Sequence, residues 1–368
     1  MKGTIRLLKY DNIPVFIHWS FSFIFLWVFY NGYRHHLGWE QIIFLTTLLL
    51  ALFGCVTLHE FGHALMAKRF GINTKDIVLS PIGGIARLDS IPNNPSQEFK
   101  IAIAGPAVNV GIALALSPYF LFFPFSNLMT FFGEIDINYQ PSLLEIFIPG
   151  LIGMNLILAV FNMLPAFPMD GGRVFRALLS TKLSRLLATR IATVVGQLFA
   201  VGLVIWGFYQ GNIITSFVGV FVFLAATQEF KHVKFENLIA QYKVSDLIRY
   251  DYTSFLPSTT LREVRDKINH GLENRFLVID EDGDLKGVIH EEFVLDVGQL
   301  DHLDEIIEPM VSQNFTYLSL DDNLNDVYKL MQSKGYYLLP VKSENEIVGV
   351  IDSKMLNQFL RKMKKKRK

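Results

Sequence analysis

Long stretches without charged side chains occupy the first 230 residues and restrict how this chain can fold. A helix that crosses a membrane needs roughly 20 apolar residues. Stretches of about this length or more lie at residues 12–33, 41–58, 101–125, 146–169 and 191–228. The last stretch is too long for one span, and Gln210-Gly211 near its middle is typical of a turn. We therefore expect about six transmembrane helices.

Composition divides the chain into two parts. The whole chain is 51% hydrophobic and 18% charged, whereas soluble domains are about a quarter charged, and the shortage of charge ends near residue 230. We expect an α-helical polytopic membrane domain followed by a soluble α/β part. The predicted boundaries are a membrane domain at 1–230, a linker at 231–242, two soluble domains at 243–300 and 301–361, and a basic tail at 362–368, interpreted as a solvated end. The formal net charge of +0 gives no basis for nucleic-acid binding.

Basic residues predict the orientation in the membrane. They gather before the first apolar stretch, between the second and third, and after the fourth, at residues 2–9, 68–100 and 173–190. Loops rich in Lys and Arg remain on the cytoplasmic side. We expect the N-terminus and the soluble part to be cytoplasmic, with the chain in the cell membrane in contact with the lipid bilayer.

The second apolar stretch ends in the motif His-Glu-x-x-His at residues 59–63. Residues four apart share a helix face, so His59 and His63 can hold one metal ion. Glu60 can act as the general base toward an attacking water. On a soluble helix, the motif would indicate only a polar surface. At the end of a membrane helix, three ionisable side chains are costly and require partners.

Asp170 is the candidate for a third metal ligand. A catalytic zinc usually has three protein ligands and one open position. Asp170 follows Pro165 and Pro168 and precedes two glycines, a pattern that breaks a helix. Irregular backbone at membrane depth is tolerated where it is buried in protein or lines a watery cavity. Asp170 could instead cap a helix, but the histidine pair on the same side of the membrane favours the ligand.

The two motifs together resemble the site-2 protease family of intramembrane zinc metalloproteases. Residues 162–171 read Asn-x-x-Pro-x-x-Pro-x-Asp-Gly, and Asp170 lies 107 residues after His63 (170 − 63). The resemblance covers the membrane part. It implies a metalloendopeptidase with one Zn²⁺ per chain, whose substrates are membrane-anchored proteins cut in or near their transmembrane segments. Glu60 would take a proton from water and pass it to the leaving amine.

The same resemblance implies roles for further residues. Asn162 matches the asparagine that faces the substrate carbonyl, where an amide can stabilise an oxyanion; an interhelical hydrogen bond is the alternative. Gly83 and Gly84 belong to a segment that looks like a strand-forming loop able to add an extended substrate as a further strand; an ordinary turn is the alternative. Asn109 follows a Gly-Pro pair and is predicted to support the site. His18 is interpreted as a hydrogen-bonded histidine and not as a ligand.

The soluble part contains an internal repeat with an offset of 62 residues. Residues 276–280 match 338–342, and residues 284–290 match 346–352. Each unit reads helix, strand, turn, strand, helix, and two such units can bury a shared face. The repeat resembles a tandem pair of cystathionine beta-synthase (CBS) domains, a regulatory module.

CBS domains often bind adenine nucleotides, but this chain departs from their ribose-binding pattern of Thr or Ser followed by Asp. The corresponding positions hold His290 and Phe293 in the first unit, and Asp352 and Met355 in the second. These residues place nucleotide binding in doubt. Association of the chain into a homo-oligomer, or contact with substrate near the membrane, are alternative roles of the pair.

Two other functions are compatible with parts of the sequence. A transporter or channel regulated by the CBS-like pair could use an intramembrane site of His and Asp. An inactive relative could act as a scaffold. A transport site does not need Glu60 beside the histidine pair, and an inactive relative does not need the full set of His59, Glu60, His63 and Asp170. The sequence therefore favours the protease.

Overall fold

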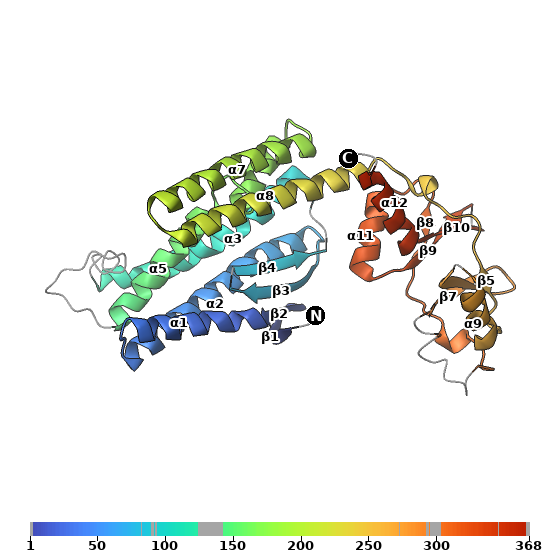
Figure 1. Ribbon diagram of the computed structural model, residues 1–368, viewed down its shortest axis with the longest axis horizontal. Coiled ribbons are helices and arrows are strands. Elements are labelled where there is room, and N and C mark those ends of the chain that lie inside the picture. The colour runs from blue at the N-terminus through green and yellow to red at the C-terminus, as the bar shows by residue number, and fades with distance from the viewer. Residues whose placement is uncertain are drawn as a thin grey trace. The chain divides into compact units, whose positions relative to one another are not determined.

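A computed structural model describes residues 3–81, 83–89, 92, 94–123, 143–271, 273–291, 294, 303–344 and 346–365 (Figure 1). The chain forms two compact units, Met1–Val233 and Lys234–Lys368. The division lies close to residue 230, where the sequence predicts the end of the membrane domain.

Among the residues that the structure describes, five helices are long and apolar enough to cross a membrane. They are α2 (Trp39–Arg69), α3 (Pro95–Leu116), α5 (Leu143–Asn162), α7 (Arg185–Tyr209) and α8 (Ile213–Ile239). A 3-10 turn, η2 (Ser117–Leu121), follows α3. The turn between α7 and α8 lies where the sequence predicts it. Residues 231–239, predicted as a linker, are instead the last turns of α8.

The N-terminal stretch differs from the predicted first membrane helix. Residues Ile13–His18 form strand β2, which pairs antiparallel with β1 (Thr4–Tyr10). A 3-10 turn, η1 (Trp19–Phe21), then leads into α1 (Ser22–Arg34), whose 13 residues are fewer than a complete span requires. In place of the predicted first span, the chain therefore forms a β-hairpin, β1 and β2, followed by the short helix α1.

The local sequence explains this hairpin. Asp11 and Asn12 have φ angles of 47° and 65°, and Asp and Asn tolerate the left-handed conformation that tight hairpin turns demand. Ile13 and Val15 alternate with less buried residues, which is the period of a strand and not of a helix. High apolarity conceals this alternation in the sequence.

A four-stranded sheet covers the part of α2 that carries the histidine motif. Its order is β1-β2-β3-β4, with β3 at Thr74–Ser80 and β4 at Gly83–Leu88. Strands β2 and β3 run parallel, whereas β3 and β4 are antiparallel. Ile13, Val15, Ile77 and Leu79 pack with Phe61 and other side chains of α2 in one buried cluster. This packing places β4, an edge strand, beside the motif.

The break predicted at the two prolines is present. Helix α5 ends at Asn162 and α6 (Asp170–Leu179) begins eight residues later, after an irregular segment at residues 163–169. The N–H of Met169 donates to the carbonyl oxygen of Ala166 at 3.0 Å, which closes a turn just before α6. Asp170 is the first residue of α6, whose N-cap is Met169 and has no side-chain capping hydrogen bond. The alternative role of Asp170 as the helix cap is therefore not observed, and Asp170 instead lies in the metal-ligand cluster described below.

The soluble unit consists of two repeats of the same kind. The first contains β5 (Ser254–Phe255), α9 (Leu261–His270), β6 (Arg275–Ile279) and β7 (Leu285–His290). The second contains β8 (Leu318–Ser319), α11 (Leu324–Lys334), β9 (Leu338–Ser343), β10 (Glu346–Asp352) and α12 (Ser353–Lys365). The sheets have the orders β5-β6-β7 and β8-β9-β10, with the first pair parallel and the second antiparallel in both. Residues 295–302 and Phe293, where the predicted boundary of the first domain and one ribose position fall, lie outside the described residues.

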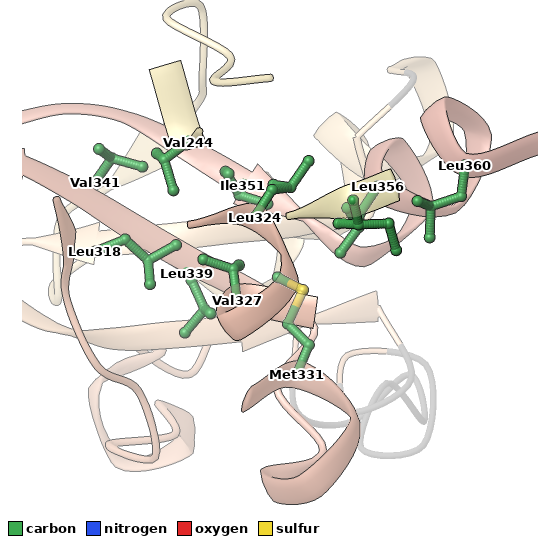
Figure 2. Close-up of a cluster of buried hydrophobic side chains, with 11 residues drawn as sticks. Val244, Leu318, Leu324, Val327, Met331, Leu339, Val341, Ile351, Leu356 and Leu360 are labelled. Carbon is green, nitrogen blue, oxygen red and sulfur yellow. The ribbon is translucent and has the colours of Figure 1, made fainter. Parts of the chain in front are cut away.

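The second repeat has the larger buried cluster, drawn in Figure 2. Leu339, Val341 and Ile351 from β9 and β10 meet Leu324, Val327 and Met331 from α11, while Leu356 and Leu360 of α12 complete it. Alternate residues of the strands and residues three to four apart on the helices supply these contacts. The repeat detected in the sequence is thus a repeat of the fold.

Candidate metal centre

His59, His63 and Asp170 converge on one point. Their ligand atoms lie within 4.8 Å of one another. Asp170 Oδ2 is 3.2 Å from His59 Nε2 and 3.1 Å from His63 Nε2, and the two Nε2 atoms are 3.1 Å apart. All three residues are buried, at 5–9% exposed. The fold therefore brings together the predicted pair on α2 and the residue that begins α6.

The other ring nitrogen of each histidine faces an oxygen acceptor on or near α3. His63 Nδ1 is 2.7 Å from the carbonyl oxygen of Ile101, and His59 Nδ1 is 2.5 Å from Oδ1 of Asn109. A carbonyl oxygen can only accept, so both rings carry their proton on Nδ1. Each Nε2 faces Asp170 and, in the neutral imidazole, carries the lone pair that can bind a metal.

A chain of amides fixes the orientation of Asn109. Its Nδ2 donates to Oδ1 of Asn155 at 2.8 Å, and Asn155 Nδ2 donates to the carbonyl oxygen of Leu151 at 2.8 Å. Both asparagines are completely buried. Sequence analysis did not identify Asn155, although an amide in the middle of the apolar helix α5 was a usable signal, because such a group needs a partner at membrane depth.

These three residues fit a zinc ion. With both imidazoles neutral, three lone-pair donors stand 3.1–3.2 Å from one another, an arrangement that a cation would stabilise. Around a tetrahedral zinc with bonds of about 2.0–2.1 Å, ligand atoms are roughly 3.3 Å apart. The Nδ1 hydrogen bonds are the kind of outer contact that orients histidine ligands.

Gly105 of α3 provides room for this cluster. A Cβ built at this position would lie 2.3 Å from His63 Nε2 and 2.6 Å from His59 Nε2. No side chain fits there unless the ligands move. The Gly105-Pro106 pair thus marks a close approach of the α3 backbone to the two histidines.

Glu60 is held by the edge strand β4. Its Oε2 accepts a hydrogen bond of 2.8 Å from the backbone N–H of Ala86. Gly84 lies against the Glu60 side chain, since a Cβ at Gly84 would be 2.7 Å from Glu60 Cγ. Gly83 has a φ of 133°, which L residues rarely adopt, and nothing lies within 4 Å of its Cβ position. The two glycines therefore have different structural roles.

The structure places the remaining predicted residues outside this cluster. Asn162 ends α5 and is half-buried, and the hydrogen bonds that orient the two histidines do not include it. His18 caps the 3-10 turn η1, where its Nδ1 lies 2.7 Å from the hydroxyl of Ser20. This local role agrees with the interpretation of His18 as a hydrogen-bonded residue.

A buried ion cluster joins α6 to two other helices. The guanidinium of Arg176, completely buried, donates to Glu98 of α3 at 2.5 and 2.8 Å and to Glu229 of α8 at 2.6 Å. Its Cζ also lies 4.9 Å from the ring centroid of Phe167, three residues before Asp170. Helix α3, which orients both histidines, therefore also holds the helix that begins with Asp170.

A cluster of possible metal ligands on the membrane-type helix α2 and the start of α6, with a glutamate inside the His-x-x-x-His spacing, is typical of a membrane-embedded metalloprotease. Family comparison agrees: residues 47–145 and 138–206 match the model of peptidase family M50. Residues 244–292 and 304–362 match the CBS domain.

This chain is similar to several individual proteins. A zinc metalloprotease of Methanocaldococcus jannaschii is 35% identical over 266 residues, which cover 72% of each chain. A Synechocystis relative is 28% identical over 96% of this chain and 94% of its own length. The solved site-2 protease of M. jannaschii is 36% identical and covers 62% of this chain and 95% of its own, with a TM-score of 0.45.

The chain belongs to peptidase family M50, the site-2 protease family. It is a multi-pass membrane metalloprotease with a C-terminal pair of CBS domains.

Proposed function

We propose that this chain hydrolyses peptide bonds in or next to transmembrane segments of membrane-anchored proteins, with one zinc ion held by His59, His63 and Asp170. The observation that carries this proposal is the convergence of three buried ligand atoms at one point, two of them on the membrane-type helix α2 and one at the start of the short helix α6. A transmembrane substrate hides its carbonyls from water, so a site at this depth serves substrates that soluble proteases cannot reach.

The residues of the site have separate tasks. A zinc ion bound there would polarise the scissile carbonyl and make a water molecule a stronger nucleophile at neutral pH. Glu60, next in sequence to His59, takes the proton of the attacking water and delivers it to the leaving nitrogen. Asn109 and the Ile101 carbonyl hold the two imidazoles in the tautomer whose Nε2 can bind a metal.

Substrate positioning falls to the edge strand and to Asn162. Strand β4 ends the sheet, and an edge strand offers unpaired backbone groups to an extended peptide. Asn162, at the end of α5, directs its amide to the substrate carbonyl and stabilises the developing oxyanion. Both assignments rest on the resemblance of these segments to the family motifs.

The CBS pair has the regulatory role in this proposal. His290 and Met355, like Phe293, replace expected ribose contacts, and Asp352 already lies 3.4 Å from Arg275. The pair therefore acts through association of chains or through contact with substrate, and binding of adenine nucleotide is the less favoured mode. By the distribution of basic residues, the pair and the N-terminus lie in the cytoplasm.

Zinc per chain and cleavage of a co-expressed membrane protein test this function together. Purified wild-type protein should contain about one zinc, and His59→Ala and Asp170→Ala should lose it or bind it far more weakly. Glu60→Gln should keep the zinc and abolish cleavage. Cleavage by Glu60→Gln would contradict the assigned base, whereas full zinc in Asp170→Ala alone would show that another residue is the third ligand.

A further inference from the structure

The outer edge of β4 is partly occupied by the proposed base. Ala86 pairs with Ile77 of β3, and Gly84 pairs with Leu79. The N–H of Ala86 donates to Glu60 Oε2 at 2.8 Å and so points away from β3. Residues of an antiparallel strand alternate between inward and outward backbone groups. The backbone groups of Gly84 therefore face outward as well.

Glu60 reaches this edge because β4 lies directly over one turn of α2. A Cβ at Gly84 would lie 2.7 Å from Glu60 Cγ and 3.2 Å from Val56 Cγ1, and Val56 is one turn before Glu60 on α2. Only glycine at 84 allows this approach. The carboxylate then extends past Gly84 to the next outward N–H, that of Ala86.

An extended peptide that adds to β4 would need the same backbone groups. Strand addition uses the outward N–H and C=O groups of the edge strand, here those of Gly84 and Ala86. The N–H of Ala86 cannot donate a linear hydrogen bond to a substrate carbonyl and to Glu60 at the same time. One partner must leave when the other binds.

We propose that Glu60 and the substrate backbone compete for the N–H of Ala86, so that strand addition by the substrate releases the carboxylate to act as the base. This inference rests on the proposed function of the site. It makes Ala86 a positioning residue through its backbone and gives Gly84 the task of admitting Glu60 to the edge. Without substrate, the base is held on β4; with substrate, it is free to face the attacking water.

The competition can be measured on inactive, zinc-loaded, full-length proteins, so that the probe stays intact. Gln at position 60 can still accept from the N–H of Ala86, whereas Ala cannot. The probe is a fluorescent ten-residue peptide of alternating Val and Thr with a Lys at each end. Its affinity is measured for Glu60→Gln and Glu60→Ala, each with Ala86 intact and with Ala86→Pro. Proline removes the outward N–H of this position, and proline is tolerated on edge strands where that N–H faces away from the neighbouring strand.

With Ala86 intact, we expect Glu60→Ala to bind the probe roughly fivefold more tightly than Glu60→Gln, the value of about one hydrogen bond. With Ala86→Pro, the ratio should fall to about one. Ala86→Ser keeps the N–H and is the matched control, for which the ratio should persist. The same peptide N-methylated at every residue cannot pair as a strand, and its affinity should not differ between Glu60→Gln and Glu60→Ala.

Three results would overturn the inference: equal affinities with Ala86 intact, a ratio that survives in Ala86→Pro, or binding of the probe to none of the four proteins. The N-methylated peptide keeps the test decisive should Ala86→Pro not fold. Zinc content and cleavage by the wild type decide the proposed function separately, because the affinity ratio is measured on proteins that do not cleave.

Discussion

Gly105 lies where helix α3 passes closest to the two histidine ligands. In Gly105→Ala, the added methyl would stand 2.3–2.6 Å from both Nε2 atoms, so at least one imidazole must leave its position. Loss of outer contacts alone costs tenfold to a hundredfold in metal affinity. We therefore expect zinc affinity, measured against a chelator of known affinity, to fall by at least about a hundredfold.

Gly111→Ala is the matched control for this change. Gly111 lies on the same helix, and a Cβ there meets nothing within 4 Å. It should bind zinc as the wild type does and be equally or slightly more stable, because alanine favours a helix over glycine. Wild-type affinity in Gly105→Ala would refute the arrangement of the two imidazoles described here.

At this scale, the sequence predicts residue types but not their contacts. His59, His63 and Asp170 could be proposed because a metal needs such side chains and because two motifs specify their order. An amide inside an apolar run, such as Asn155, signals that a partner is needed but does not identify it, and the Ala86 N–H, a backbone group on a strand, carries no signal at all. Their roles depend on which helix and strand lie beside α2, and that is a property of the fold.

At the scale of the elements, a buried ion cluster holds three helices together. Arg176 joins α6 to Glu98 of α3 and Glu229 of α8 while completely buried. Removing one partner from a buried ion cluster leaves uncompensated charge and costs roughly 3–5 kcal/mol. We expect Arg176→Met to lose about this much in its free energy of unfolding, measured with denaturant in detergent. Zinc affinity should fall as well, because α6 carries Asp170.

Arg190→Met controls for the loss of a positive charge, since Arg190 lies on α7 and is exposed. It should change the free energy of unfolding by less than about 0.5 kcal/mol. If Arg176→Met matched Arg190→Met in stability and zinc affinity, the ion cluster would not anchor α6.

The sequence predicts a helix or strand most successfully where a single physical requirement determines that element. Spans such as α7 and α8 follow from length and apolarity, and their turn from Gln210-Gly211. The strand β2 does not, because a run that is apolar throughout looks the same as helix or strand until its partners are known. Strand β2 pairs with β1 and with β3, which begins at Thr74, and that distant pairing decides the outcome.

At the scale of the whole molecule, one chain joins a unit of membrane-type helices to an α/β unit of the soluble type. The first pairs the polar groups of its site and of its buried ion cluster, as at His59, Asn109 and Arg176. The second repeats a small α/β fold with ordinary polar surfaces. Helix α8 extends from Ile213 to Ile239 and so passes the division at Val233. The orientation of α7 and α8 in the membrane therefore decides on which side the CBS pair begins.

This orientation can be tested with the natural chain as background, because its single cysteine, Cys55, is buried. Gln210, in the turn between α7 and α8, and Glu281, in the loop before β7, are both exposed. The basic residues near the start of α7 predict that this end of the helix is cytoplasmic. Gln210→Cys should react with a membrane-impermeant maleimide in intact cells, whereas Glu281→Cys should react only after lysis. Wild-type protein should remain unlabelled in both, and the reverse pattern for the two variants would contradict cytoplasmic CBS domains.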